Sequence, residues 1–240
     1  AVQGTVSAVN RIGRTVPVVR DVAESRNVRL LAGLLGPAYR GLVQRKYKHT
    51  ETTEIALGGN VHFDWAYRRD FPEMTRLYEF AKDSQWNATK DLDWSRDIDP
   101  LGRDKLVPDQ FVPTYKHRIW KKLNKVERAN QRHAMLSWTL SQFLHGEQGA
   151  LFAAAQVTEA VPWLDAKLFG ATQVMDEGRH VEVFHRYLTQ KLERRYEIND
   201  NLYVVIDAIM SDARWDMKFL GMQIMIEGLA LGSFGMIRNI

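Results

Sequence analysis

The feature of this sequence that most limits its fold is the absence of proline from residues 115–160. Proline inside a helix removes a hydrogen bond and clashes with the preceding turn, so a proline-free stretch of this length favours one long helix or two shorter ones. Pro162 marks a turn, and residues 163–196 form a second long helical pattern. A third pattern begins near Asn201 and continues to the end. Long helices joined by short turns predict an antiparallel bundle.

The region before these helices is mixed in character. A short amphipathic helix over residues 30–47 is interrupted by a Gly-Pro pair, and another helix begins with Pro72 at its first position. We therefore predict an all-α protein, with an N-terminal arm over residues 1–70 and a helical bundle over residues 71–240. Because the chain begins without Met and stops inside an apolar helical run, we expect it to be a segment of a longer gene product.

Composition excludes several classes of function. The 33 basic and 29 acidic residues are interleaved, which indicates solvated helix faces rather than a nucleic-acid surface. The absence of cysteine excludes disulfides, thiolate metal sites and a cysteine nucleophile, and leaves His and carboxylates as metal ligands. The N-terminus also lacks the apolar core of a secretory signal. We therefore expect a cytoplasmic protein without a nucleic-acid partner.

Three glutamates lie among apolar residues, one in each long helical pattern: Glu147, Glu177 and Glu227. A carboxylate buried in this way costs several kcal/mol unless something compensates its charge, and a metal ion would do so. Glu147 precedes Pro162 by 15 residues and Glu177 follows it by 15, so at about 1.5 Å per residue both carboxylates reach the same level on facing helices. His180 follows Glu177 by one turn. This arrangement predicts half of a carboxylate-bridged dimetal site.

A second Glu-x-x-His pair, Glu182 and His185, lies five residues after the first. Five helical residues turn the chain by about 500°, which leaves the second pair roughly 140° away from the first. Its neighbours are polar, so we expect a solvated pair there. Glycine flanks each of the three buried acids, which indicates either open space or close helix approach at a site, or ordinary tight packing.

Three segments carry a resemblance to a known superfamily. They are "HGEQGALFAAA", "MDEGRHVEVF" and "MIEGLAL". They resemble the first three ligand segments of the ferritin-like di-iron carboxylate superfamily, within which they are most similar to bacterial multicomponent monooxygenase hydroxylases and ribonucleotide reductase small subunits. The segment "SQWNATKDLDWSRDID" is similar to the stretch that leads into the bundle of those proteins. The resemblance covers roughly residues 75–240.

The resemblance implies a ferritin-like four-helix bundle with extra N-terminal helices and two iron ions. Such a centre activates dioxygen to hydroxylate or desaturate a small organic substrate, and a manganese–iron pair is an alternative. By the same resemblance, Glu147 would be a terminal ligand of the first iron and His180 its imidazole ligand. Glu177 would bridge both ions, and Glu227 would bind the second. We also expect an electron-donating reductase and a homo-oligomer, a dimer.

Two further residues match the motif, and two features depart from it. In the Asp-Glu-x-Arg-His form, Asp176 would orient a ligating histidine across the site, with Arg179 as its partner. A fourth ligand segment, another Glu-x-x-His, should lie some thirty residues after Glu227, beyond Ile240. The reductase subunits place a radical tyrosine one turn after the histidine, where this chain has Phe184. This difference argues against a tyrosyl-radical reductase.

Three other interpretations remain beside the oxygen-activating enzyme. The incomplete ligand set also fits a metal-free or half-sited ferritin-like subunit with a role in assembly. Iron storage fits less well, because storage proteins lack a long N-terminal region. Residues 219–237 approach the length of a membrane span, but a glutamate near the bilayer centre costs about 2.5–3.5 kcal/mol. We therefore predict a bundle helix there and no membrane span.

Overall fold

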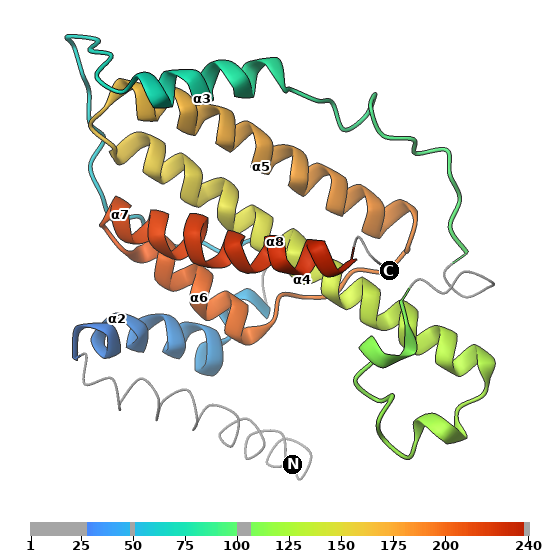
Figure 1. Cartoon of the computed structure of the whole chain (residues 1–240). Coiled ribbons are helices and arrows are strands. Elements are labelled where there is room, and N and C mark those ends of the chain that lie inside the picture. The colour runs from blue at the N-terminus through green and yellow to red at the C-terminus, as the bar shows by residue number, and fades with distance from the viewer. Residues whose placement is uncertain (1–27, 49–50, 100–106, 238–240) are drawn as a thin grey trace. The chain divides into compact units, whose positions relative to one another are not determined.

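The computed structural model describes residues 28–48, 51–99 and 107–237 of the chain (Figure 1). The predicted all-α class is confirmed, since the described residues form helices, turns and loops and contain no strand. The chain divides into two compact units, Ala1–Thr53 and Glu54–Ile240. Within the described ranges, no helix combines the length and the apolarity that crossing a bilayer would need.

The helices follow one another in this order. The first unit contains α2 (Val28–Ala38), the π-helical turn η1 (Tyr39–Gln44) and the 3₁₀ turn η2 (Lys46–Lys48). The second unit contains α3 (Pro72–Asp83), the 3₁₀ turns η3 (Asp109–Phe111) and η4 (Trp120–Lys122), α4 (Lys125–Ala160), α5 (Leu164–Gln190), α6 (Asp200–Ser211), α7 (Trp215–Lys218), the π-helical segment η5 (Phe219–Ile226) and α8 (Glu227–Ile237).

The centre of the second unit is the antiparallel pair α4 and α5. The sequence left open whether residues 115–160 form one helix or two, and the structure has one α-helix, preceded by turns. Its start is fixed by a capping box: Glu127 N donates to Asn124 Oδ1 (2.9 Å) and Asn124 N donates to Glu127 Oε2 (2.7 Å). In Figure 1, α5 returns alongside α4, α3 lies on the outer side of α5, and α6 to α8 lie on the other side of α4.

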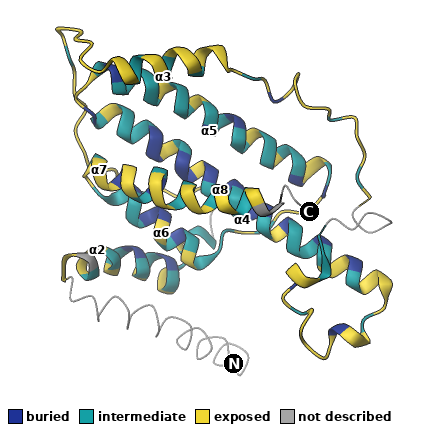
Figure 2. Cartoon of the chain, viewed as in Figure 1, coloured by how far each residue is buried: buried dark blue, intermediate teal, exposed yellow. Residues whose placement is uncertain are grey.

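Two apolar clusters hold this arrangement together, and both include α4. The first joins α4 to α6 and η5 through Ala150, Ala153, Ile206, Met210 and Met222. The second joins α4 to α5 and the residues after it through Leu140, Leu144, Leu188 and Leu192. Burying a leucine or methionine side chain stabilises the fold by about 1.5–3 kcal/mol. Figure 2 accordingly shows the buried positions along the inner faces of α4 and α5.

The second long helix ends earlier than predicted, at Gln190 rather than near residue 196. Glu193 takes the left-handed conformation (φ 49°), which turns the chain out of the helix. The following segment is then held by polar side chains of α4. Tyr196 N donates to Ser141 Oγ (2.9 Å), and Asn199 N donates to the Gln142 side chain (2.7 Å).

The prediction of one continuous helix from Asn201 onward is wrong, because the chain breaks between α6 and α7. Asp212 has an extended backbone (φ −72°, ψ 135°), and its carboxylate accepts from Arg214 N (2.9 Å) and pairs with the Arg214 guanidinium. Such a short-range bond competes with helical hydrogen bonding. The buried Lys218 then donates to the terminal carbonyls of α6 at Ile209 (3.0 Å) and Met210 (2.7 Å).

The segment that precedes α3 belongs to the second unit, which begins at Glu54. Asp165, in the first turn of α5, anchors this segment. Its buried carboxylate accepts from Arg69 Nε (2.5 Å), Phe71 N (3.0 Å) and Thr75 Oγ1 (2.8 Å). These bonds, first of all the one from Arg69, lower the pKa of Asp165 to about 2.

Replacing Asp165 by Asn should therefore destabilise the second unit, with a fall in Tm of roughly 5 °C at neutral pH. The lowered pKa means that the charged carboxylate stabilises the fold above its unfolded pKa of 3.8, and that this contribution is lost as the pH falls through about 2. Thermal denaturation across this range measures both effects. Asp216→Asn is the matched control, because Asp216 holds the same helical position in α7 but is exposed. Equal Tm values for the two variants would contradict the anchoring role.

Candidate metal centre

Three potential ligands meet between α4 and α5. Glu147 of α4 and Glu177 and His180 of α5 offer ligand atoms that all lie within 4.8 Å of one another. His180 Nδ1 lies 3.0 Å from Glu147 Oε2 and 3.2 Å from Glu177 Oε2. Both glutamates are buried, with 5% and 4% of their surface exposed. The predicted meeting of these side chains across the turn at Pro162 is thus present in the structure.

The two buried carboxylates and the imidazole change one another's protonation. Burial, followed by the neighbouring Glu147, raises the pKa of Glu177 above its usual 4.5. Hydrogen bonds to Glu147 and then to Glu177 raise the pKa of His180 to about 10. The imidazolium of His180 therefore balances part of the negative charge.

Glu227 lies beside this cluster but not within the group of ligand atoms that meet. It is the first residue of α8, which follows the π-helical segment η5. Burial raises its pKa to about 7, and the charges of Glu177 and Glu147 contribute to the same shift. The structure thus brings three of the four predicted ligands into one cluster and leaves the fourth electrostatically coupled to them.

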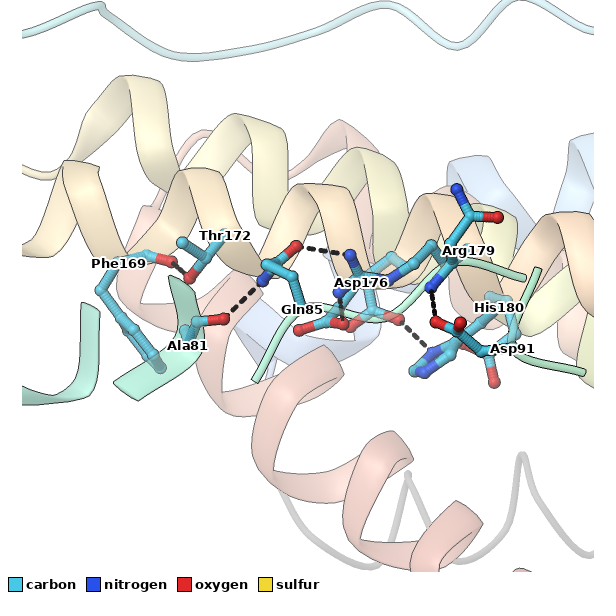
Figure 3. A network of polar contacts seen from close by, with 11 residues as sticks. Ala81, Gln85, Asp91, Phe169, Thr172, Asp176, Arg179 and His180 are labelled. Atoms are coloured by element: carbon cyan, nitrogen blue, oxygen red, sulfur yellow. Dashed lines mark hydrogen bonds and ion pairs between the residues drawn. The ribbon is translucent and has the colours of Figure 1, made fainter. Parts of the chain in front are cut away.

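Asp176 and Arg179 form the ion pair that the motif predicts. Figure 3 shows the Arg179 guanidinium between Asp176 and Gln85, which it binds through Nη2 and Nη1 respectively. The indole of Trp86 lies 5.2 Å from the guanidinium carbon and 6.4 Å from the His180 ring. The predicted role of Asp176 in orienting a histidine stays a prediction.

Sequence reasoning missed Gln85 and Trp86, which come from the irregular segment after α3 and have no spacing relation to the motif. It also missed an amide bridge from Gln173 to Gln223. A signal for this bridge was present, because each glutamine lies four residues before a candidate ligand, Glu177 or Glu227. The bridge fixes α5 against η5 one turn away from the carboxylates.

The remaining Glu-x-x-His pair and the histidines of α4 lie outside the cluster of Glu147, Glu177 and His180. Glu182 and His185 are exposed, as predicted for a solvated pair, and Glu182 accepts from Thr89 Oγ1 at 3.2 Å. The two histidines of α4 bind backbone carbonyls: His133 Nε2 lies 2.8 Å from Leu192 O, and His145 Nε2 lies 2.9 Å from Tyr196 O.

The glycines around the acids serve two different purposes. A Cβ on Gly149 would lie 3.1 Å from Ile206 Cδ1, so this glycine permits close approach of α4 and α6. A Cβ on Gly146, Gly178 or Gly228 would meet nothing within 4 Å. At these three positions, therefore, the space that a side chain would occupy is open.

A cavity of about 510 Å³ lies away from this cluster. Its lining includes His133, Lys191 and Arg194 but none of the six predicted site residues. His133 precedes Glu147 by 14 residues on α4, a distance of about 21 Å along the helix. The cavity therefore does not belong to the cluster of Glu147, Glu177 and His180.

Comparison with known proteins adds no identification. No protein-family model, no curated protein and no solved structure matches this chain.

Proposed function

We propose that the chain is a non-haem, metal-dependent oxidoreductase of the ferritin-like di-iron carboxylate type, which activates dioxygen to oxidise a small organic substrate. The observation that carries this proposal is the cluster of two buried carboxylates and one imidazole on facing helices. Buried carboxylates in such proximity need a compensating cation, and a metal ion is the strongest one available.

The donor atoms fit a first-row transition metal. Two carboxylate oxygens and an imidazole nitrogen suit iron, manganese or zinc. His180 Nδ1 lies 3.0 Å from Glu147 Oε2 and 3.2 Å from Glu177 Oε2, so these three atoms are close enough together that they would hold one ion. Glu227, one helix away, would hold the second ion of a pair.

The chain's own residues would bind, orient and exclude water. The carboxylates of Glu147 and Glu177 are buried and would bind the metal. The amide bridge from Gln173 to Gln223 holds α5 against η5. In the metal-free protein, Glu227, whose pKa is about 7, would exchange a proton near neutral pH. An iron pair bound there would supply the electrons that reduce dioxygen.

A cluster of three phenylalanine rings near the candidate ligands favours an apolar substrate. Phe143 precedes Glu147 by one turn, Phe184 follows His180 by one turn, and Phe234 lies on α8. The Phe234 ring centroid is 4.9 Å from that of Phe143 and 6.1 Å from that of Phe184. Three phenyl rings clustered one turn from the candidate ligands would suit an apolar substrate and would exclude water from that side.

Iron loading under anaerobic conditions tests this proposal. We expect the purified chain to bind Fe²⁺ and, once exposed to air, to consume dioxygen faster than an equal amount of Fe²⁺ in buffer. An oxygen electrode and iron analysis of the desalted protein measure the two quantities. Glu147→Ala should abolish the excess rate. If the iron-loaded protein consumed dioxygen no faster than an equal amount of Fe²⁺ in buffer, the oxidase function would be refuted.

A second candidate, a metal-free subunit with a role in assembly, is favoured by two observations. The His180 imidazolium already balances part of the charge of Glu147 and Glu177. An apolar face on η5 and α8 is also exposed, at Ile224 (55%), Met225 (60%) and Leu229 (74%), as at a protein interface. Under this function the desalted protein contains no stoichiometric metal after growth or reconstitution with iron.

A further inference from the structure

The first unit carries an apolar stripe along one side of α2 and η1. Val28, Leu35, Tyr39 and Val43 are 75%, 69%, 55% and 66% exposed, and Ala32 between them is exposed as well. Successive spacings of four, three, four and four residues place these side chains on one face of a helix. The opposite side carries the buried Pro37 and Gly41. Figure 2 shows exposed positions recurring along this helix.

The same segment is basic throughout. Residues 28–48 contain five basic residues and no acidic one. They are Arg29, Arg40, Arg45, Lys46 and Lys48. Since the whole chain has a net charge of +4, the remaining residues together have a net charge of −1. The positive charge of the protein is therefore concentrated where the apolar stripe is exposed.

We propose that α2 and η1 bind in the plane of an anionic membrane surface. An amphipathic helix with an apolar stripe and a basic remainder matches the apolar interior and the negative headgroups of such a bilayer. The exposed Arg29 lies roughly 100° round the helix from the stripe, where a long side chain reaches headgroups while the stripe enters the acyl region. Tyr39, with an apolar ring and a polar hydroxyl, suits the boundary between the two.

A negatively charged surface is a better partner than a neutral one, because the segment has no carboxylate that would be repelled. This proposal concerns the first unit alone and does not depend on the metal centre.

Flotation with lipid vesicles tests the proposal on the full chain. We expect the protein to float with phosphatidylcholine vesicles that contain about 30% phosphatidylserine, and about tenfold less with pure phosphatidylcholine or in about 0.5 M NaCl. Leu35→Glu with Val43→Glu should abolish flotation. Arg29→Glu with Lys46→Glu, which keeps the stripe intact, should weaken it by at least about tenfold.

The matched control places the same charges on another exposed helix. Leu77→Glu with Phe80→Glu alters α3, where these residues are 46% and 70% exposed, and should leave flotation unchanged. Circular dichroism checks that all variants keep their helix content. Absence of the wild-type protein from phosphatidylserine vesicles overturns the proposal. So does a change of oligomeric state on sedimentation of Leu35→Glu with Val43→Glu, which would assign the stripe to a protein partner.

Discussion

Replacing Glu177 and His180 together by Ala should lower the affinity of the chain for Co²⁺, a spectroscopic stand-in for Fe²⁺, by at least about 100-fold. These residues supply two of the three donor atoms that lie within 4.8 Å of one another. The remaining Glu147 would offer one carboxylate, which does not hold a divalent ion tightly in water. Visible absorption during Co²⁺ titration measures both the affinity and the coordination.

The chain contains its own control for this experiment. Glu182→Ala with His185→Ala changes the same two residue types, at the same spacing, on the same helix, but both side chains are exposed. This variant should bind Co²⁺ as the wild type does. Equal losses in both double variants, or no loss in either, would show that the buried pair is not a metal site.

Substitution of Glu177 alone also separates a metal-binding role of this residue from a purely structural one. In the metal-free protein, Glu177 is buried and its pKa is raised, so its removal relieves a desolvation cost. Glu177→Ala also loses the hydrogen bond with His180, which opposes this gain, so we expect the metal-free variant to keep a Tm close to that of the metal-free wild type. The wild type alone should then gain Tm on addition of Co²⁺, since a ligand that binds only the folded state stabilises it.

The agreement between sequence and structure at this site has a simple physical origin. Helical rise is constant, so counting 15 residues on either side of Pro162 is enough to bring Glu147 and Glu177 to one level. Apolar neighbours then identify which side of each helix is buried. No tertiary information is needed for either step, and both held.

Other features of the fold and of the site depend on interactions that residue spacing alone does not reveal. The break at Asp212 has neither glycine nor proline and arises from a side chain that binds its own backbone neighbour. In η5 the turns are π-helical, so the residues advance by a smaller angle than in an α-helix, and the direction of Glu227 cannot be counted from Asn201. Gln85 reaches Arg179 from 94 residues away in the sequence, a contact that only the tertiary fold creates.

The affinity of the centre for Co²⁺ should rise steeply with pH. A metal ion must displace the proton that His180 carries, because hydrogen bonds to Glu147 and Glu177 raise its pKa to about 10. Each binding event therefore releases one proton at any pH below this value, and the apparent affinity increases by about tenfold per pH unit between pH 7 and 9. Below pH 7 the slope should be greater, since Glu227, whose pKa is about 7, then also holds a proton.

Stability should change with pH in opposite directions in the two forms of the protein. In the metal-free form, the raised pKa of His180 contributes stability that is complete below its unfolded value of 6.5 and is lost as the pH rises through about 10. With Co²⁺ bound, rising pH removes the competing protons and strengthens binding, so Tm should increase over the same range.

Calorimetric titrations of Co²⁺ in two buffers of different ionisation enthalpy count the protons released on binding. Glu227→Gln should abolish only the extra release below pH 7. An affinity that does not change between pH 7 and 9 would mean that His180 Nδ1 does not bind the ion.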